Sequence, residues 1–417
     1  MSRSSRLFRL VACASALLAA VTTRAATNEV SHWNRIAVDA TTRAMPLDPN
    51  TESRILSIVH VAMHDAVNAI QPRFRTFASR PENAAGASLE AAVASAACTA
   101  LGALLPNERA AFETECNARL LAIADSDSRT RGLAIGKAAA QAMLALRQND
   151  GSTNAAAWPA GKQPGEYRPT PPDFTPALGS LWGNVRPFVL KTSDQFRPAP
   201  PPAAGSERAR ADLEEVRRLG GLHSTERTHE QSEIACFWYE MSTRGWNRIA
   251  REVASIRRLD TWEQARLFAL VNMAMADGYI AGFEAKYHYN YWRPATLVRE
   301  SGEPEWLAYL RNPPVPDYPS THTVLGAAAA VVIARSVGTD LVSFSLTSGD
   351  PYPNITRRFW SLSQAARENG ASRVLCGVHF SSAVEAGYAQ GEAIGTWAYE
   401  NALTPVSSES IAIASLQ

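Results

Sequence analysis

The sequence has no large excess of charge of either sign. It contains 41 lysine and arginine residues against 40 aspartates and glutamates. A near-neutral balance gives no general attraction to nucleic acid or to an anionic membrane, so any anion site must be local. Charged residues make up only 19% of the chain and apolar residues 46%. This composition excludes a disordered protein and predicts a packed globular body.

Long apolar runs are also missing from most of the chain. The best candidate, 324–334, is interrupted by Gly326 and is shorter than the roughly 20 residues that span a bilayer. The N-terminus is different, because three arginines precede an apolar run at 10–21 and small residues precede a cleavage point after Ala25. This pattern predicts a signal peptide over residues 1–25 and a secreted or periplasmic protein with no integral membrane association.

Cysteine is scarce, and the sequence has no CxxC pair, glycine-rich phosphate loop or nucleophile elbow. Of the five cysteines, Cys13 lies in the predicted signal peptide. Cys98 and Cys116 lie on either side of a predicted turn at Pro106-Asn107, and antiparallel helices would bring their thiols to similar heights. A disulfide formed in an oxidising compartment and two buried free thiols are equal alternatives here.

Strand-like alternation is rare, whereas apolar residues recur at three- and four-residue spacing, for example in "ESRILSIVHVAMHDAVNAI". This helical spacing is interrupted only by a stretch dense in proline and glycine. The aromatic residues in that stretch predict an ordered connector. We therefore predict an all-α protein of two helical bundles. Its predicted parts after the signal peptide are an N-terminal helical half at 26–148, the connector at 149–205, a C-terminal bundle at 206–403 and a tail at 404–417.

The stretch "KYHYNYWRPATLV" places Lys286 seven residues before Arg293. At 100° per residue the two cations would share one helical face, two turns apart, and Pro294 would end the helix. Two fixed cations at that spacing suit a multivalent anion. Taken alone, this stretch has a structural alternative, in which Lys286 and Arg293 lie on a solvent-exposed helix face and the aromatic rings pack beside them.

A second stretch, "DYPSTHTVLGAAAA", predicts that a helix begins at Ser320. The N-terminus of a helix presents free N–H groups and a positive dipole end, which together attract an anion. His322 would lie in the same first turn and could act as an acid or a base. A packing histidine in a turn is the structural alternative.

The third stretch, "ASRVLCGVHFSSAVEAG", contains Arg373 and His379. Six residues correspond to about 240° around a helix, so the two side chains would not share a face of one continuous helix. Gly377 offers a break that would let both point inward. A new helix would then begin near His379.

Taken together, the ordered motifs K-x6-RP, PSxH and SR-x5-H resemble the signature of the type 2 phosphatidic acid phosphatase superfamily. This superfamily includes vanadium-dependent haloperoxidases and bacterial acid phosphatases. The motifs cover about residues 286–387, and flanking segments such as "IACFWYEMSTRGWNRIA" also resemble bacterial vanadium haloperoxidases. The residues that carry the resemblance are Lys286, Arg293, Pro294, Pro319, Ser320, His322, Ser372, Arg373 and His379.

The resemblance implies an oxyanion site in the core of the C-terminal bundle. Lys286, Arg293 and Arg373 would neutralise a tetrahedral anion. The Ser320 hydroxyl and the Thr321 backbone N–H would donate hydrogen bonds to its oxygens. The implied cofactor is vanadate, for which phosphate is a chemical substitute.

The two histidines would have different roles by the same resemblance. His379 would contact the central atom, either as the metal ligand of vanadate or as the nucleophile toward a phosphoryl group. His322 would be the acid–base group. It would take a proton from hydrogen peroxide in a peroxidase or protonate the leaving alcohol in a phosphatase. An acidic residue is expected to hold this histidine, and Glu240 in "FWYEMS" is the candidate.

Three positions depart from the family pattern. Thr321 replaces the usual glycine, so a side chain could narrow the cavity. Ala383 occupies the place where phosphatases have an aspartate that orients the second histidine, so His379 needs another partner. Val315 replaces an aromatic residue or histidine at the halide site, which leaves the halide preference open.

Three functions are consistent with these residues. The first is a vanadate-dependent haloperoxidase that uses hydrogen peroxide and halide, with an organic acceptor and a homo-oligomer left open. The second is an exported acid phosphatase that forms a phosphohistidine, and the third is a non-catalytic oxyanion-binding protein. His60, His64 and Asp65 have a spacing that could hold zinc, but no glutamate or third histidine follows in a metalloprotease pattern, so we interpret them as structural.

Overall fold

The computed structural model describes residues 28–44, 48–79 and 84–406. The predicted signal peptide and most of the tail lie outside these residues. Helices dominate the described chain, and its only sheet is a pair of short strands, β1 (Phe344–Thr347) and β2 (Thr356–Phe359). The predicted all-α class is confirmed, although the hairpin was not predicted.

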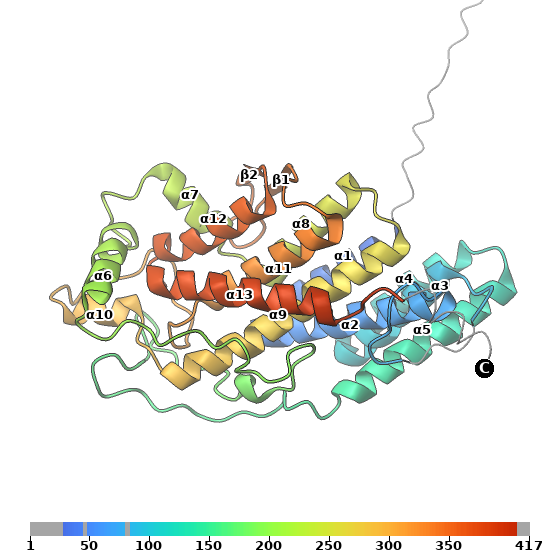
Figure 1. The fold of residues 1–417 in the computed structure, drawn as a ribbon, viewed down its shortest axis with the longest axis horizontal. Helices are drawn as coiled ribbons and strands as arrows, with labels where there is room; N and C mark the ends of the chain where they lie inside the picture. Colours follow the sequence, from blue (N-terminus) through green and yellow to red (C-terminus); the bar gives the residue numbers. More distant parts are fainter. Residues whose placement is uncertain (1–27, 45–47, 80–83, 407–417) are drawn as a thin grey trace, which may run out of the picture.

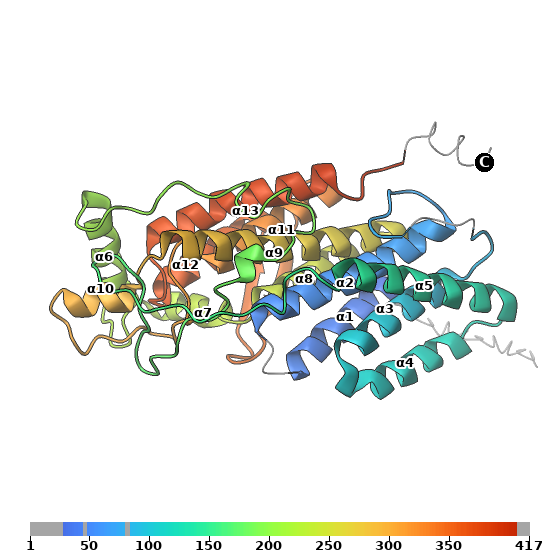
Figure 2. The same cartoon turned by 90° about the horizontal axis from the view of Figure 1, so that it is seen from below.

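The N-terminal half is a group of antiparallel helices (Figures 1 and 2). Polar caps define where they begin: the Asp48 carboxylate accepts from two N–H groups of the next helix, whose first residue is Pro49. The helices are α1 (Glu29–Arg43), α2 (Pro49–Ile70), α3 (Leu89–Leu104), α4 (Arg109–Leu121) and α5 (Ser126–Arg147).

The C-terminal half is built around one long helix, α9 (Thr261–Tyr289), which begins at a capping box formed by Asp260 and Glu263. Its neighbours α11 and α13 run beside it (Figure 1). The other helices of this half are α6 (Glu207–Leu219), α7 (His229–Phe237), α8 (Ser242–Ile256), α10 (Pro294–Glu300), α11 (Thr321–Val337), α12 (Leu362–Leu375) and α13 (Ser381–Asn401).

The two halves are not separated by a solvent layer. Helix α2 packs along α9, and one continuous cluster of buried apolar side chains reaches from α1 to α13. The N-terminal half therefore supports the helix that carries Lys286.

Three glycines allow the close packing of α13 on α11. A Cβ atom placed on Gly387, Gly391 or Gly395 would lie 2.6, 2.2 or 2.5 Å from a backbone oxygen of α11 or of its cap, Ser320. Any larger residue would push the helices apart. This contact fixes the helix that follows His379 against the helix that follows Ser320.

The connector at 149–205 runs along the body as irregular chain with one short turn of 3-10 helix, η2 (Trp182–Asn184) (Figure 2). Its contacts with α9 are specific. The buried Asp277 carboxylate accepts hydrogen bonds from the N–H groups of Phe188, Val189 and Leu190 at 2.6–2.9 Å. Arg197 pairs with Glu284 on the same helix. The connector thus supplies partners to α9 side chains that would otherwise be buried without them.

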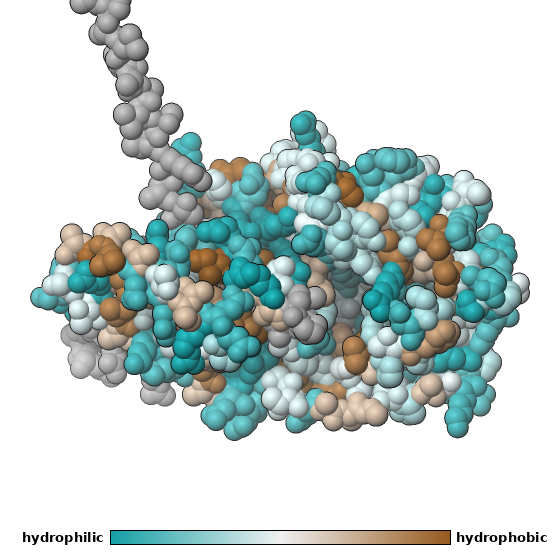
Figure 3. Space-filling model, turned by 180° about the vertical axis from the view of Figure 1, so that it is seen from behind, coloured by the Kyte–Doolittle hydropathy of each residue, from teal (hydrophilic) through white to brown (hydrophobic). Residues whose placement is uncertain are grey.

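Apolar and hydrophilic residues are mixed on the face shown in Figure 3. Within the part of the chain that the structure describes, no helix combines the length and hydropathy needed to cross a bilayer.

Candidate functional site

The C-terminal end of α9 differs from the sequence prediction. The helix ends at Tyr289 because Asn290 adopts a left-handed conformation with φ of 49°. Arg293 therefore lies outside α9, in extended geometry, and Pro294 begins α10. Lys286 and Arg293 do not share a helical face. A turn, rather than helical periodicity, brings the two cations together.

Lys286 is fully buried, and its Nζ donates to three backbone carbonyls. The acceptors are Pro316, Asp317 and Pro319 at 2.7, 2.8 and 2.7 Å. Burial and the neighbouring Arg293 lower the pKa of Lys286 well below its usual value. Its three protons are used on carbonyls, so Lys286 holds the segment before Ser320 in place, and it could act on an anion only through its charge.

The start of α11 is where the sequence predicted it, but the capping is different. Ser320 occupies the N-cap position, yet its hydroxyl makes no capping hydrogen bond. Instead, Thr323 donates to Ser320 Oγ at 2.9 Å, and both residues are fully buried. The proton of the Ser320 hydroxyl is thus left to be donated elsewhere, next to the free N–H groups of the first helical turn.

The side chain of Thr321 lies against α9. Its Cγ2 would be 2.5 Å from a Cβ placed on Gly282, so the absence of a side chain at Gly282 is what accommodates the methyl group. The predicted cost of a side chain at position 321 is therefore relieved by a glycine on the facing helix.

Arg373 and His379 are separated by the break that the sequence indicated. Helix α12 ends at Leu375, Gly377 has φ of 76°, and α13 begins at Ser381. A Cβ on Gly377 would lie 2.1 Å from the Gly220 carbonyl oxygen, so the position requires glycine.

Arg373 is a buried cation with unused donors. Its side chain is 4% exposed, and among the described residues neither Nε nor Nη1 has a hydrogen-bond partner. The ring of Tyr239 lies 5.7 Å from its Cζ. An unpaired buried guanidinium is costly for folding, so this arrangement favours a site for an anion.

Asp317, which the sequence analysis did not single out, lies at the centre of the cluster. Its Oδ1 is 2.9 Å from His379 Nδ1 and 3.7 Å from Arg293 Nη1. Oδ1 and Nδ1 lie within hydrogen-bonding distance, but the ring N–H is not well aligned with the oxygen, so the contact is close without being a formed hydrogen bond. Burial raises the pKa of Asp317 to about 7, against the opposing effects of Arg293 and Lys286.

Arg293 completes the surroundings of His379. Its Nη1 lies 3.2 Å from His379 Nε2 and 2.6 Å from the Val378 carbonyl, and its Nε donates to the Val315 carbonyl at 2.8 Å. Burial, followed by the charges of Arg293, Lys286 and Arg373, lowers the pKa of His379 well below its usual value. The imidazole is thus held neutral, which leaves a lone pair for a metal or for attack.

His322 is held by a hydroxyl rather than by a carboxylate. Its Nδ1 lies 2.9 Å from Ser242 Oγ, at the start of α8, while its Nε2 is covered and has no partner among the described residues. Burial and Arg373 lower its pKa well below the usual value. A neutral His322 with a free Nε2 is suited to accept a proton.

Glu240 is not the partner of His322, in contrast to the prediction. Its carboxylate is paired with Arg248, and the Cβ of a side chain at Gly245 would collide with it at 2.7 Å. Burial raises the pKa of Glu240. The structure therefore corrects this assignment to Ser242, two residues further along the chain.

Comparisons with known proteins show which family the chain belongs to. A family model described as the second helical-bundle domain of VCPO matches residues 266–408. The vanadium chloroperoxidase of Curvularia inaequalis is 26% identical, over 85% of this chain and 78% of that protein. A non-specific acid phosphatase of Salmonella typhimurium (strain LT2) is 30% identical, over 49% of this chain and 73% of the phosphatase. The chain belongs to the acid phosphatase and vanadium haloperoxidase superfamily.

Solved structures of this superfamily extend the likeness to the whole body. A bacterial vanadium-dependent iodoperoxidase superposes with a TM-score of 0.80 at 26% identity, covering 91% of this chain and 98% of that one. A holo-type bacterial vanadium-dependent chloroperoxidase gives 0.70 at 18% identity, covering 85% and 92%, which shows the shared fold.

The residues present fit a tetrahedral oxyanion of the superfamily type. Lys286, Arg293 and Arg373 supply three cations, and Asp317 supplies one carboxylate, so the cluster has a formal excess of two positive charges. The unpartnered donors of Arg373 and the free proton of Ser320 are the groups that a dianion would use. Vanadate and phosphate have this shape and charge.

Other candidate residues lie outside the cluster. No group of three potential metal ligands of the His, Cys, Asp or Glu type occurs within residues 28–44, 48–79 and 84–406. His60 and His64 are hydrogen-bonded inside the N-terminal half, consistent with a structural role. Cys98 and Cys116 are neighbouring free thiols in this structure.

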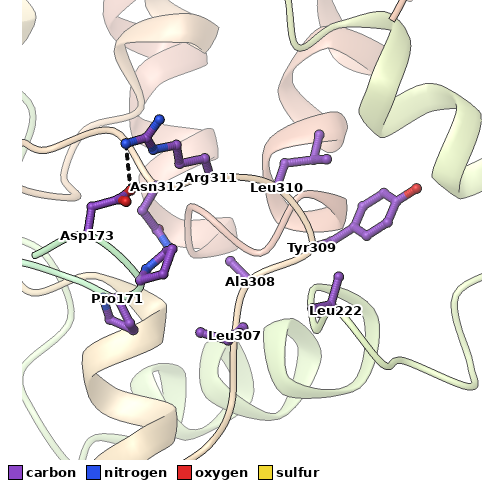
Figure 4. Close-up of a pocket in the computed structure, with 10 residues that line it drawn as sticks. Pro171, Asp173, Leu222, Leu307, Ala308, Tyr309, Leu310, Arg311 and Asn312 are labelled. Atoms are coloured by element: carbon purple, nitrogen blue, oxygen red, sulfur yellow. Dashed lines mark ion pairs between the residues drawn. The ribbon is translucent and has the colours of Figure 1, made fainter. Parts of the chain in front are cut away.

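A surface pocket of about 340 Å³ is also separate from the cluster (Figure 4). It lies between the 307–312 segment and Pro171–Asp173, with an ion pair of 2.6 Å between Arg311 and Asp173 at its edge. None of the oxyanion-site residues lines it. One wall contacts the site's framework, since Leu310 N–H donates to the Cys376 carbonyl next to Gly377.

Proposed function

We propose that this protein is a vanadate-dependent haloperoxidase that oxidises halide with hydrogen peroxide. The observation that carries the proposal is the extent of the structural likeness. The iodoperoxidase is matched over 98% of its length, whereas the phosphatase alignment covers only 49% of this chain. The N-terminal half that buttresses α9 is thus shared with haloperoxidases.

Bound vanadate would supply a Lewis-acidic centre that polarises hydrogen peroxide toward attack by halide. Arg373 and Ser320 would donate to the anion's oxygens, and Lys286 and Arg293 would offset its charge. Neutral His379 would offer Nε2 to the metal, since Asp317 lies at its Nδ1. His322 would accept a proton from peroxide at its free Nε2.

The predicted signal peptide adds a location to this proposal. We expect the mature chain to act outside the cytoplasm, where peroxide and halide are supplied by the surroundings. A size comparison of the chain from cells and from their medium or periplasm would test this expectation: cleavage after Ala25 predicts a shorter chain in the exported fraction.

A phosphatase is the second candidate, because the phosphatase relative is 30% identical and a carboxylate contacts His379 in this chain. On the same residues, His379 Nε2 would attack a phosphoryl group and His322 would protonate the leaving alcohol.

One experiment separates the two functions. Metal-free protein is assayed for peroxide-dependent oxidation of iodide and bromide, with and without orthovanadate, and for hydrolysis of an aryl phosphate. Halide oxidation that depends on vanadate supports the proposal, and hydrolysis inhibited by vanadate supports the alternative. His379→Ala should abolish the activity that is present, because it removes the group that contacts the central atom. Full activity in that variant would contradict both assignments.

A further inference from the structure

The segment before α11 is held by the cations of the site. Arg293 Nε donates to the Val315 carbonyl, and Lys286 Nζ donates to the carbonyls of Pro316, Asp317 and Pro319. Both cations are fully buried. Buried charge-assisted hydrogen bonds of this kind fix a backbone more firmly than neutral ones, so the position of Asp317 is set by the motif cations.

The Asp317 side chain points from this segment to one atom of His379. Its Oδ1 lies 2.9 Å from Nδ1, and both residues are buried. The other ring nitrogen, Nε2, lies 3.2 Å from Arg293 Nη1, on the side where the cations gather. The two nitrogens of His379 therefore have opposite environments: Nδ1 faces a carboxyl group that can accept its proton, and Nε2 faces cations.

We propose that Asp317 is a positioning residue that holds the proton of His379 on Nδ1 and keeps the lone pair of Nε2 directed at the oxyanion. The proposal rests on the proposed function only for the identity of that anion. The physical reason is that a carboxylate beside Nδ1 stabilises the tautomer that donates to it, while cations beside Nε2 disfavour a proton there.

Asp317 also explains how His379 is oriented although Ala383 follows it by four residues. Ala383 has a fully buried methyl group packed with Phe380 and Tyr318, and no carboxylate is available on α13 at that position. The acid reaches His379 from a different element, the segment that leads into α11. Lys286 thus has a second task, because it holds the backbone from which Asp317 projects.

The tautomer of His379 tests the proposal without any anion. In full mature chain labelled with ¹⁵N-histidine, the His379 signals are assigned by their loss in His379→Gln, and their ¹⁵N shifts show which nitrogen carries the proton. We expect the proton on Nδ1 in the wild type and in Asp317→Asn, since the amide oxygen still accepts a hydrogen bond. In Asp317→Ala we expect a shift toward a proton on Nε2. A wild-type proton on Nε2, or an unchanged tautomer in Asp317→Ala, would overturn the proposal.

Vanadate affinity gives the second readout. Equilibrium dialysis against orthovanadate should show binding weakened by about 10–100-fold in Asp317→Ala, the usual cost of losing such a partner. Asp317→Asn should lose less. The matched control is Asp277→Asn. Asp277 is also a fully buried aspartate, but it accepts hydrogen bonds from backbone N–H groups outside the cluster, so this variant should bind vanadate like the wild type.

The outcomes distinguish this inference from the proposed function. Equal vanadate affinity in the wild type and Asp317→Ala overturns the positioning role and leaves the haloperoxidase proposal standing. A wild type that binds no vanadate overturns the haloperoxidase proposal, and the tautomer measurement then decides the role of Asp317 by itself. The wild-type tautomer is measured without Asp317→Ala, so the test remains decisive if that variant does not fold.

Discussion

Two buried polar clusters in this protein have opposite hydrogen-bonding states. In the first, side chains from four helices satisfy one another: Asn34 of α1 contacts His60 of α2 at 2.8 Å and donates to Asn247 of α8 at 2.6 Å, and Asn247 pairs with Asn272 of α9 at 2.8 Å. In the second, the oxyanion cluster, Arg373 and His322 keep buried nitrogens that have no partner among the described residues.

The difference separates a structural role from a functional one. A satisfied buried network contributes to stability and fixes helix positions, and removing one member leaves its partners unpaired. An unsatisfied buried cation costs stability and is retained where something outside the chain completes it. Both clusters contain a buried histidine, so burial alone does not identify the site. The partners do.

The largest effect is expected for Arg373→Met. It removes two unpaired donors that we assign to the anion, each worth about 1.5–3 kcal/mol as a charged hydrogen bond. Vanadate affinity should fall by at least about 100-fold, measured by equilibrium dialysis, while urea unfolding without anion should show no loss of stability.

The matched control is Asn247→Ala in the satisfied network. It should lower the free energy of unfolding by about 2 kcal/mol, because it removes the buried hydrogen bonds that Asn247 makes with Asn34 and Asn272, and should not change vanadate affinity. If Arg373→Met lowered the stability and Asn247→Ala lowered the vanadate affinity, the distinction between the two clusters would be wrong.

The next effect concerns pH. Burial lowers the pKa of His60 to about 4, with Arg251 acting in the same direction, whereas the unfolded chain protonates near 6.5. The unfolded state therefore binds more protons in this window, and stability is lost as the pH falls from about 6.5 to about 4. The loss from His60 should reach roughly 3 kcal/mol. Urea unfolding at several pH values would show a smaller acid loss in His60→Gln than in the wild type; parallel curves would contradict this account.

The smallest effect is expected for Ser242→Ala. Without the hydroxyl at Nδ1, His322 loses the partner that orients its ring, and we expect turnover to fall about 10-fold, or about 1.4 kcal/mol, with vanadate affinity unchanged. Glu240→Gln is the comparison, because Glu240 pairs with Arg248 instead. A larger fall in turnover for Glu240→Gln than for Ser242→Ala would return the orienting role to Glu240.

Much of the fold and part of the site could be predicted from the sequence. Helical periodicity predicted the all-α class, and a lone glycine between Arg373 and His379 indicated the break between helices that the structure places at Gly377. The motif residues were identified through their resemblance to the family signature, since each stretch alone left a structural alternative open. The prediction that Lys286 and Arg293 share one helical face was wrong. Asn290 adopts a left-handed conformation and ends α9 before Arg293 is reached.

The partners of the two histidines could not be predicted. Ser242 is 80 residues from His322 and Asp317 is 62 residues from His379, so neither pair has a periodicity that a sequence displays. Glu240 was chosen for its charge, although a hydroxyl holds His322. The pairing of Thr321 with Gly282 also depends on two helices meeting. Contacts between elements depend on tertiary packing, which a single sequence does not show.

The most direct test of the oxyanion cluster is a count of bound vanadium. Purified wild-type chain is dialysed against orthovanadate, and the retained vanadium is measured by elemental analysis with and without excess phosphate. We predict saturation at one vanadium atom per chain and displacement by phosphate. No retained vanadium, or binding that phosphate does not displace, would contradict the account.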